Sequence, residues 1–147
     1  MTEDQQSPRP DPALKALDIM VGTWDLRGRD FTTKEETSGQ STFKWMEGGF
    51  FLVHRFNFDY AGRRFAGVEY IGYDAKSRHL KTHVFSTQDP NPLQYTWQVD
   101  EESFTNWLGD VGSDNHYTGS FSEDRNTLIG RWEWPGGGYE ATMLRVR

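Results

Sequence analysis

The chain has 147 residues, which suits one domain, and it carries a formal net charge of -6 with a pI of about 5.2. Its 16 lysines and arginines form no basic stripe, so nucleic acid is not expected as a partner, because that binding depends on neutralising phosphates. The chain has no cysteine, so it can form neither disulfides nor thiolate metal sites. It has no apolar run long enough to span a membrane, so no membrane-spanning helix is predicted.

The N-terminal segment divides into a tail and a short helix. Residues 1–10 are polar and contain Pro8 and Pro10, which predicts a disordered tail before a single domain over residues 11–147. They lack the apolar core of a signal peptide, so we expect a cytoplasmic location. Asp11 followed by Pro12 is typical of a helix N-cap with proline at the first helical position, and predicts a helix over residues 12–20 that covers an opening.

The rest of the chain is rich in aromatic residues, with 6 Trp, 6 Tyr and 10 Phe, and is divided by regularly spaced turn signals. This composition favours strands. The predicted strands are residues 21–29, 39–47, 50–58, 64–73, 79–87, 93–99, 103–108, 115–121, 127–134 and 138–146. The connections have hairpin length, except for a longer polar loop in the segment DFTTKEETSG.

Strands joined by short hairpins in series predict an all-β antiparallel meander. An open sheet of ten strands would leave unpaired edges, which closure into an up-and-down barrel removes. Such a barrel is wide enough to hold a cavity. A two-sheet sandwich is the alternative, but no long connection calls for the crossovers that sandwiches use.

The stretch VGTWDLRGR, with Gly22 two residues before Trp24, resembles the signature of the lipocalins and the wider calycin group. The segments LDIMVGTWDLRGR, WMEGGFFLVHRF, GVEYIGYD and TLIGRWEW resemble an uncharacterised bacterial lipocalin-like family. The resemblance implies that Trp24 closes one end of a barrel. It also implies that an arginine from a late strand packs on the indole, with Arg145 favoured over Arg131.

The chain is also distantly similar to the nitrobindins, a ten-stranded branch that holds haem through a histidine near the C-terminal end. Here Leu26 replaces the middle glycine of their opening motif, and none of the four histidines lies in the last two predicted strands. Haem binding is therefore the weakest of the functions considered, and no cofactor is expected.

The strand FFLVHRFNF carries the most informative polar residue. By alternation, Phe50, Leu52, His54, Phe56 and Phe58 share its more apolar face, which predicts that this face is internal. A four-residue loop over residues 59–62 would pair His54 with Gly67 and make Glu69 a diagonal neighbour of His54. A slip of one residue would instead send His54 and Glu69 to solvent.

These residues define a candidate ligand site. His54 and Glu69 are its polar groups, and its apolar walls are predicted to include Phe56, Phe65, Trp45, Trp97 and Trp132. Whether His83 also faces inward depends on the length of the preceding loop, which the sequence does not settle. No metal site is expected.

Three functions follow from this site. The leading one is an intracellular binding protein for a small hydrophobic molecule. The second is an enzyme of the isomerase or cyclase type, with His54 and Glu69 as acid and base. The third is the haem protein. The oligomeric state is open, and a homodimer is compatible with the sequence.

Overall fold

The computed structural model describes residues 8–146. One 3₁₀ helix precedes ten strands. Their bounds are η2 (Pro12–Met20), β1 (Gly22–Asp30), β2 (Glu36–Trp45), β3 (Leu52–Tyr60), β4 (Arg63–Asp74), β5 (His79–Ser86), β6 (Leu93–Val99), β7 (Ser103–Leu108), β8 (His116–Phe121), β9 (Thr127–Trp134) and β10 (Gly137–Arg145). The predicted tail falls mostly on residues 1–7, which lie outside the described residues.

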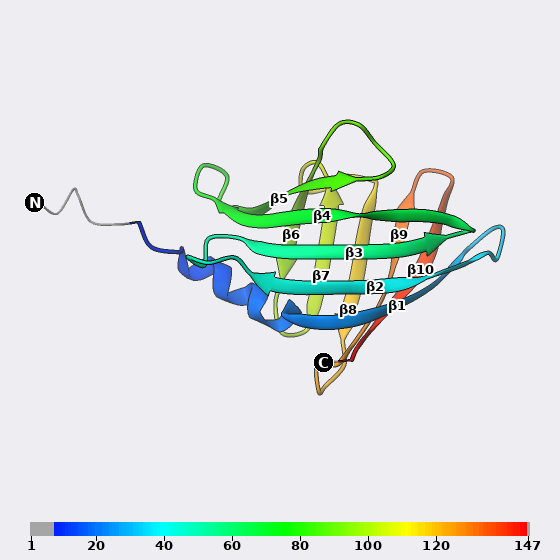
Figure 1. Ribbon diagram of the computed structural model, residues 1–147, viewed down its shortest axis with the longest axis horizontal. Helices are drawn as coiled ribbons and strands as arrows, with labels where there is room; N and C mark the ends of the chain where they lie inside the picture. Colours follow the sequence, from blue (N-terminus) through cyan, green and yellow to red (C-terminus); the bar gives the residue numbers. More distant parts are fainter. Residues whose placement is uncertain (1–7, 147) are drawn as a thin grey trace, which may run out of the picture.

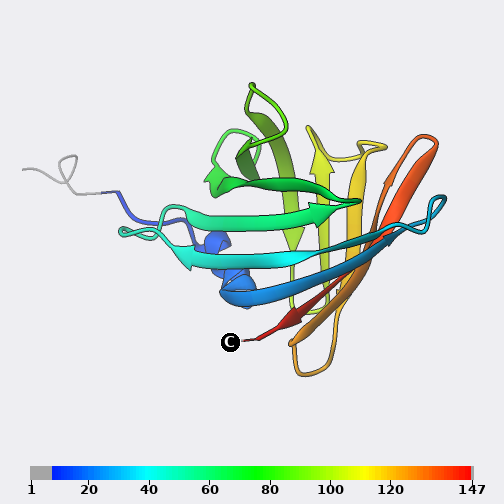
Figure 2. The same cartoon turned by 45° about the vertical axis from the view of Figure 1, so that its right-hand side comes forward.

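The ten strands form one closed antiparallel barrel, as the turn spacing predicts. Each strand pairs with its neighbour in sequence, and β10 returns to pair with β1, where Trp24 lies opposite Arg145. Figures 1 and 2 show β1 to β4 crossing one side of the barrel at a steep angle to the strands of the opposite side. Closure leaves no strand edge unpaired, so the sandwich alternative is wrong.

Two of the differences between the predicted and the observed strands have local reasons. The expected long loop is a turn over residues 31–35, because the Asp30 carboxylate accepts the backbone N–H groups of Thr32 and Thr33 and folds the chain back early. β2 therefore begins at Glu36 rather than at residue 39. Phe50 is not on the inner face of β3: it lies in the preceding turn and is 37% exposed.

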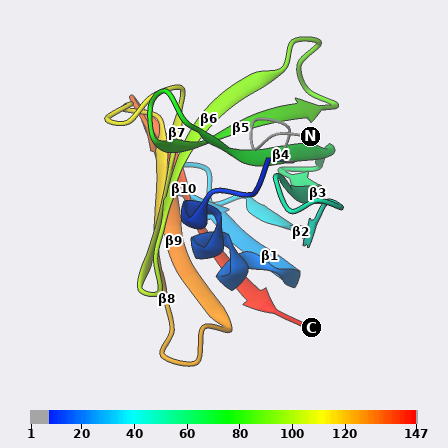
Figure 3. The same ribbon diagram turned by 90° about the vertical axis from the view of Figure 1, so that its left-hand side faces the viewer.

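The helix η2 lies across one end of the barrel (Figure 3). Asp11 caps it by accepting the N–H of Ala13, as the sequence predicts. Its buried side chains are Leu14, Leu17 and Met20. We call this end, with η2 and Trp24, the capped end, and the opposite end, which holds the hairpin turns at residues 31–35, 61–62 and 135–136, the far end.

Trp24 occupies the centre of the capped end. It is completely buried, its indole N–H donates to the Met20 carbonyl at 2.9 Å, and the Arg145 guanidinium lies 4.1 Å above its ring. Arg145 also donates to the carbonyls of Val21 and Ile19, which joins β10 to the end of the helix. The expected packing of Arg145 on Trp24 is confirmed. Gly22 has φ +130°, a conformation that glycine tolerates best.

Alternation along the strands separates an apolar interior from a polar exterior. In β5, Leu80, Thr82 and Val84 are buried, while His79 and His83 are exposed. Within residues 8–146, no helix has both the length and the apolar character needed to cross a membrane.

Candidate functional site

The barrel encloses a cavity of about 280 Å³ beyond the capped end. Met20 of η2 and Leu26 of β1 are among its lining residues, and its walls are mainly aromatic. The other lining residues are Ser41, Phe43, His54, Phe56, Phe58, Phe65, Glu69, Val84, Tyr95, Trp97, Phe104, Asn106, Asn115, Tyr117, Trp132, Trp134, Tyr139, Ala141 and Met143. Few of these side chains are ionisable, so the cavity favours a largely apolar occupant.

His54 and Glu69 both face this cavity, but their pairing differs from the prediction. His54 lies directly opposite Glu69, and Phe56 rather than His54 lies opposite Gly67. The loop between β3 and β4 comprises residues 61–62 instead of 59–62, so its centre lies one residue later in the chain. This moves the register by two and keeps the same faces inside. The two side chains are therefore direct cross-strand neighbours rather than diagonal ones.

A third residue, Ser41 on β2, completes the polar cluster. Nδ1 of His54 lies 2.9 Å from Oε1 of Glu69, and Nε2 of His54 lies 2.8 Å from Oγ of Ser41. With Glu69 as a carboxylate, which only accepts, Nδ1–H donates to it. In the neutral ring, Nε2 then accepts the hydroxyl proton of Ser41. The three residues form a hydrogen-bonded chain from serine through histidine to glutamate.

The polar cluster is buried and its imidazole is held in place. Ser41 is 1% exposed, Glu69 4%, and the His54 side chain 12%. The Phe43 ring stacks on the imidazole with centroids 4.1 Å apart and planes 11° from parallel, and the Phe56 ring lies 5.2 Å away. Hydrogen bonds on both nitrogens and rings on either side fix the orientation of the imidazole.

Four of the five predicted wall residues line the cavity, namely Phe56, Phe65, Trp97 and Trp132. The fifth, Trp45, does not line the cavity. It lies at the capped end of β2, where its indole N–H donates to the carboxylate of Asp18 at 2.9 Å, so it anchors η2 to the barrel. Alternation correctly places Trp45 on the inner side of β2, but its position at the strand end puts it beside the helix rather than in the cavity.

Tyrosines contribute polar atoms to the cavity wall. Burial, together with the negative charge of Glu69, raises the pKa of Tyr95 to about 12, so its hydroxyl stays protonated. Burial also raises the pKa of Tyr117, whose hydroxyl donates to the Ala141 carbonyl at 3.0 Å. These groups add hydrogen-bonding capacity to the cavity without adding charge.

Two buried polar atoms of the cavity-lining residues have no hydrogen-bond partner among residues 8–146. They are Nε1 of Trp97, a donor, and Oδ1 of Asn106, an acceptor. Trp97 and Asn106 lie directly opposite each other on β6 and β7. Because an unpaired buried polar group costs about 1–3 kcal/mol, such atoms mark places where water or a ligand completes the bonding.

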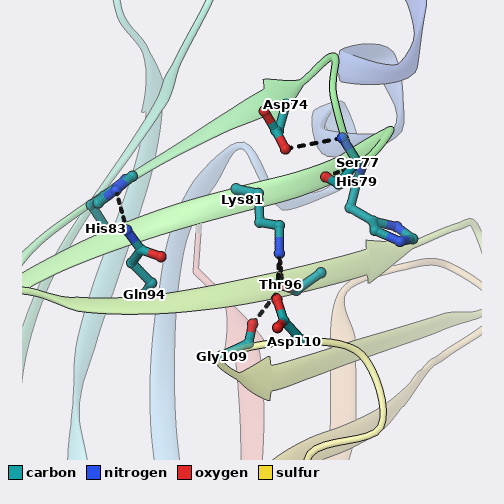
Figure 4. Close-up of polar contacts among 9 residues, drawn as sticks. All are labelled: Asp74, Ser77, His79, Lys81, His83, Gln94, Thr96, Gly109 and Asp110. Atoms are coloured by element: carbon teal, nitrogen blue, oxygen red, sulfur yellow. Dashed lines mark hydrogen bonds and ion pairs between the residues drawn. The ribbon is translucent and has the colours of Figure 1, made fainter.

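The other histidines lie outside this site. His79 and His83 are on the exposed face of β5, where His83 contacts Gln94, and His116 contacts the Ser113 carbonyl (Figure 4 shows the β5 contacts). The same face carries Lys81, which donates to Thr96 and Asp110. Among residues 8–146, no group of three or more His, Asp or Glu side chains could hold a metal ion.

Comparison with protein families matches residues 9–89 to a family described as "Protein of unknown function (DUF1579)". That match covers more than half of the chain. The chain belongs to this family. No curated protein matches the chain.

The DUF1579 match includes only part of the cavity lining. It spans η2 and β1 to β5, and so includes Ser41, His54 and Glu69. It does not extend to Trp97 or Trp132 on β6 and β9. The polar cluster therefore lies wholly within the matched DUF1579 segment, while part of the aromatic wall lies outside it.

Sequence reasoning missed Ser41, which lies on β2 beside the paired strand β3. In the barrel, Ser41 is opposite Phe56 and Phe43 is opposite His54, which brings Ser41 diagonally next to the imidazole. One signal was available: Ser41, Phe43 and Trp45 alternate with the polar residues Gln40, Thr42 and Lys44. Read as a half-buried strand, that alternation places Ser41 inside.

Proposed function

We propose that this protein binds a small, largely apolar molecule in the barrel cavity, in the manner implied by its resemblance to the lipocalins. One observation carries the proposal: an aromatic-lined cavity of about 280 Å³ with the buried Ser41–His54–Glu69 cluster on its wall. This volume is near the lower end of the usual range for small-molecule sites, about 300–1,000 Å³, so the ligand is small.

The polar part of the ligand is expected to meet Ser41 rather than His54. Both ring nitrogens of His54 already have partners, Glu69 and Ser41, so the imidazole has no free hydrogen-bonding atom to offer. The hydroxyl oxygen of Ser41 keeps accepting capacity when its proton goes to His54. This arrangement supports binding of an apolar molecule with one polar group directed at β2.

The same contacts argue against the other two functions as first framed. In the isomerase or cyclase hypothesis, His54 exchanges a proton directly with substrate, but Ser41 occupies its Nε2. Axial ligation of haem iron by His54 would also require that nitrogen to be released. The cytoplasmic location and the homodimer stay predictions of the sequence.

A matched pair of variants tests ligand binding. Val84 lines the cavity and His83, its neighbour on β5, faces outward. With an uncharged apolar fluorescent probe such as N-phenyl-1-naphthylamine, Val84→Phe should weaken binding about tenfold, equal to about 1.4 kcal/mol, because the added ring fills the cavity. His83→Phe should leave the affinity unchanged.

Probe affinity is measured by fluorescence titration, and circular dichroism checks that both variants remain folded. Equal affinities of Val84→Phe and the unmodified protein would place the probe outside the barrel and contradict the proposal. An apolar probe that fails to bind the unmodified protein would contradict it as well.

A further inference from the structure

We propose that Ser41 is a nucleophile and that the cavity hydrolyses small apolar esters through an acyl-serine intermediate. The inference rests on the proposed function, because the ester must enter the same cavity. It follows from the order of the groups: hydroxyl to Nε2 at 2.8 Å, then Nδ1 to carboxylate at 2.9 Å. A nucleophile next to a base that a third group orients is the arrangement that activates serine.

The proton has a defined route. As Oγ of Ser41 bonds to the ester carbonyl carbon, its proton passes to Nε2 of His54 and the carbonyl electrons move to oxygen. Collapse re-forms the carbonyl and breaks the bond to the alcohol oxygen, which takes the proton from His54. Water then attacks the acyl-serine by the same route, releases the carboxylic acid and restores Ser41. Glu69 acts as a positioning residue that orients the imidazole.

Side chains must stabilise the negative charge that develops on the carbonyl oxygen, since the backbone N–H groups around Ser41 lie in the strand ladder. The unpartnered Nε1–H of Trp97 is a suitable donor. The Trp97 ring lies edge to face against Phe43, with centroids 6.3 Å apart, and Phe43 stacks on His54. The donor is therefore on a cavity-lining ring that is separated from His54 by the Phe43 ring.

The cavity also limits the substrate. Its volume of about 280 Å³ admits a small molecule rather than a polypeptide, and its aromatic wall favours an uncharged acyl chain. Among residues 8–146, its lining includes no lysine or arginine to pair with a phosphate or a free carboxylate. The substrate class is accordingly a neutral ester with a short apolar acyl group.

Covalent labelling tests the nucleophile directly. An alkyl fluorophosphonate reacts when an activated serine oxygen displaces fluoride from phosphorus. We expect a single adduct on the intact protein, located at Ser41 by peptide mass spectrometry. Ser41→Ala should abolish this adduct, whereas Ser38→Ala, an exposed serine on the same strand, should leave the labelling rate unchanged.

Two further variants separate catalysis from packing. His54→Gln should slow labelling and hydrolysis of 4-nitrophenyl butyrate by about 10²–10⁴-fold, the usual contribution of a general base. Glu69→Gln keeps the size of the side chain, so the rate should fall while the affinity for the fluorescent probe stays unchanged. A purely structural role for Glu69 would leave the rate per folded molecule unaltered.

The outcomes distinguish this inference from the proposed function. A protein that binds the fluorescent probe in the cavity but gains no adduct, or carries the adduct on another residue, overturns the nucleophile and leaves the binding function standing. A protein that neither binds the probe nor reacts overturns both.

Discussion

The two ends of the barrel are built differently. At the capped end, Trp24, Leu17 and Leu52 have no exposed surface, and the indole N–H of Trp24 is hydrogen-bonded to the Met20 carbonyl. Toward the far end, rings such as Phe58 and Trp134 are only partly buried. One end therefore supplies stability, while the other leaves aromatic surface free to contact a ligand.

Removing the indole at the capped end should have the largest effect. Trp24→Ala is expected to lower the free energy of unfolding by about 3–5 kcal/mol, because it deletes a fully buried aromatic ring and leaves a cavity. The matched change at the far end, Trp134→Ala, should cost about 1 kcal/mol, since that ring is partly exposed. Urea denaturation measures both. Equal losses would remove the distinction between the two ends.

The arginine above Trp24 should contribute less than the ring itself. Arg145→Gln removes the cation–π contact and the guanidinium donors to Ile19 and Val21, with an expected loss of about 1–2 kcal/mol. Partial burial lowers the pKa of Arg145, but it remains charged at neutral pH.

Arg145→Lys, measured in the same urea titration, shows how much of this loss is due to charge alone. It should recover part of the loss, because lysine keeps the cation but cannot reach several carbonyls at once. Full recovery would assign the effect to charge alone.

The smallest effect is expected at the exposed ion pair between Lys81 and Asp110, in the loop that joins β7 to β8 near the far end (Figure 4). The hydrogen bond and charge of Lys81 lower the pKa of Asp110 below its ordinary value of 3.8. Its stabilising effect is therefore present above pH 3.8 and is lost as pH falls through the lowered pKa.

Asp110→Asn should accordingly lower the melting temperature by only about 1 °C at pH 7, and the difference should vanish in acid. Differential scanning calorimetry at pH 7 and pH 2.5 provides the comparison. A difference in melting temperature that grows in acid would contradict the expected pH dependence.

Much of the architecture could be predicted because it depends on local signals. Turn residues at hairpin spacing predicted ten strands, and alternation placed His54 and Glu69 inside. The register between β3 and β4 could not be predicted, because the hairpin uses Ala61 and Gly62 with φ of 54° and 81°. Two positive φ values mark the tight two-residue turn, and alanine gives no sequence signal for that conformation.

Of the three residues in the polar cluster, His54 and Glu69 could be predicted from the sequence and Ser41 was missed. His54 and Glu69 are on strands joined by a short hairpin, so alternation nearly suffices to bring them together. Ser41 reaches His54 through the pairing of β2 with β3 across the turn at residues 46–51. The register of that pairing is set by the length and type of this turn, which the sequence does not specify. The hydrogen-bonded chain from Ser41 to Glu69 therefore forms only when β2, β3 and β4 are paired in their final register.

The cavity also depends on side chains that are missing from the wall. Gly119, Gly130 and Ala141 lie side by side across β8, β9 and β10, and the Tyr117 ring lies against them with its hydroxyl on the Ala141 carbonyl. A methyl group on Gly119 would come within 2.8 Å of the Tyr117 ring and would push that ring toward the lumen. A methyl group on Gly130 would collide with the Thr118 carbonyl oxygen of the paired strand, so that position requires glycine for strand pairing itself. The open space inside the barrel therefore depends in part on the missing methyl group of Gly119, and Gly119→Ala would narrow the cavity by displacing the tyrosine.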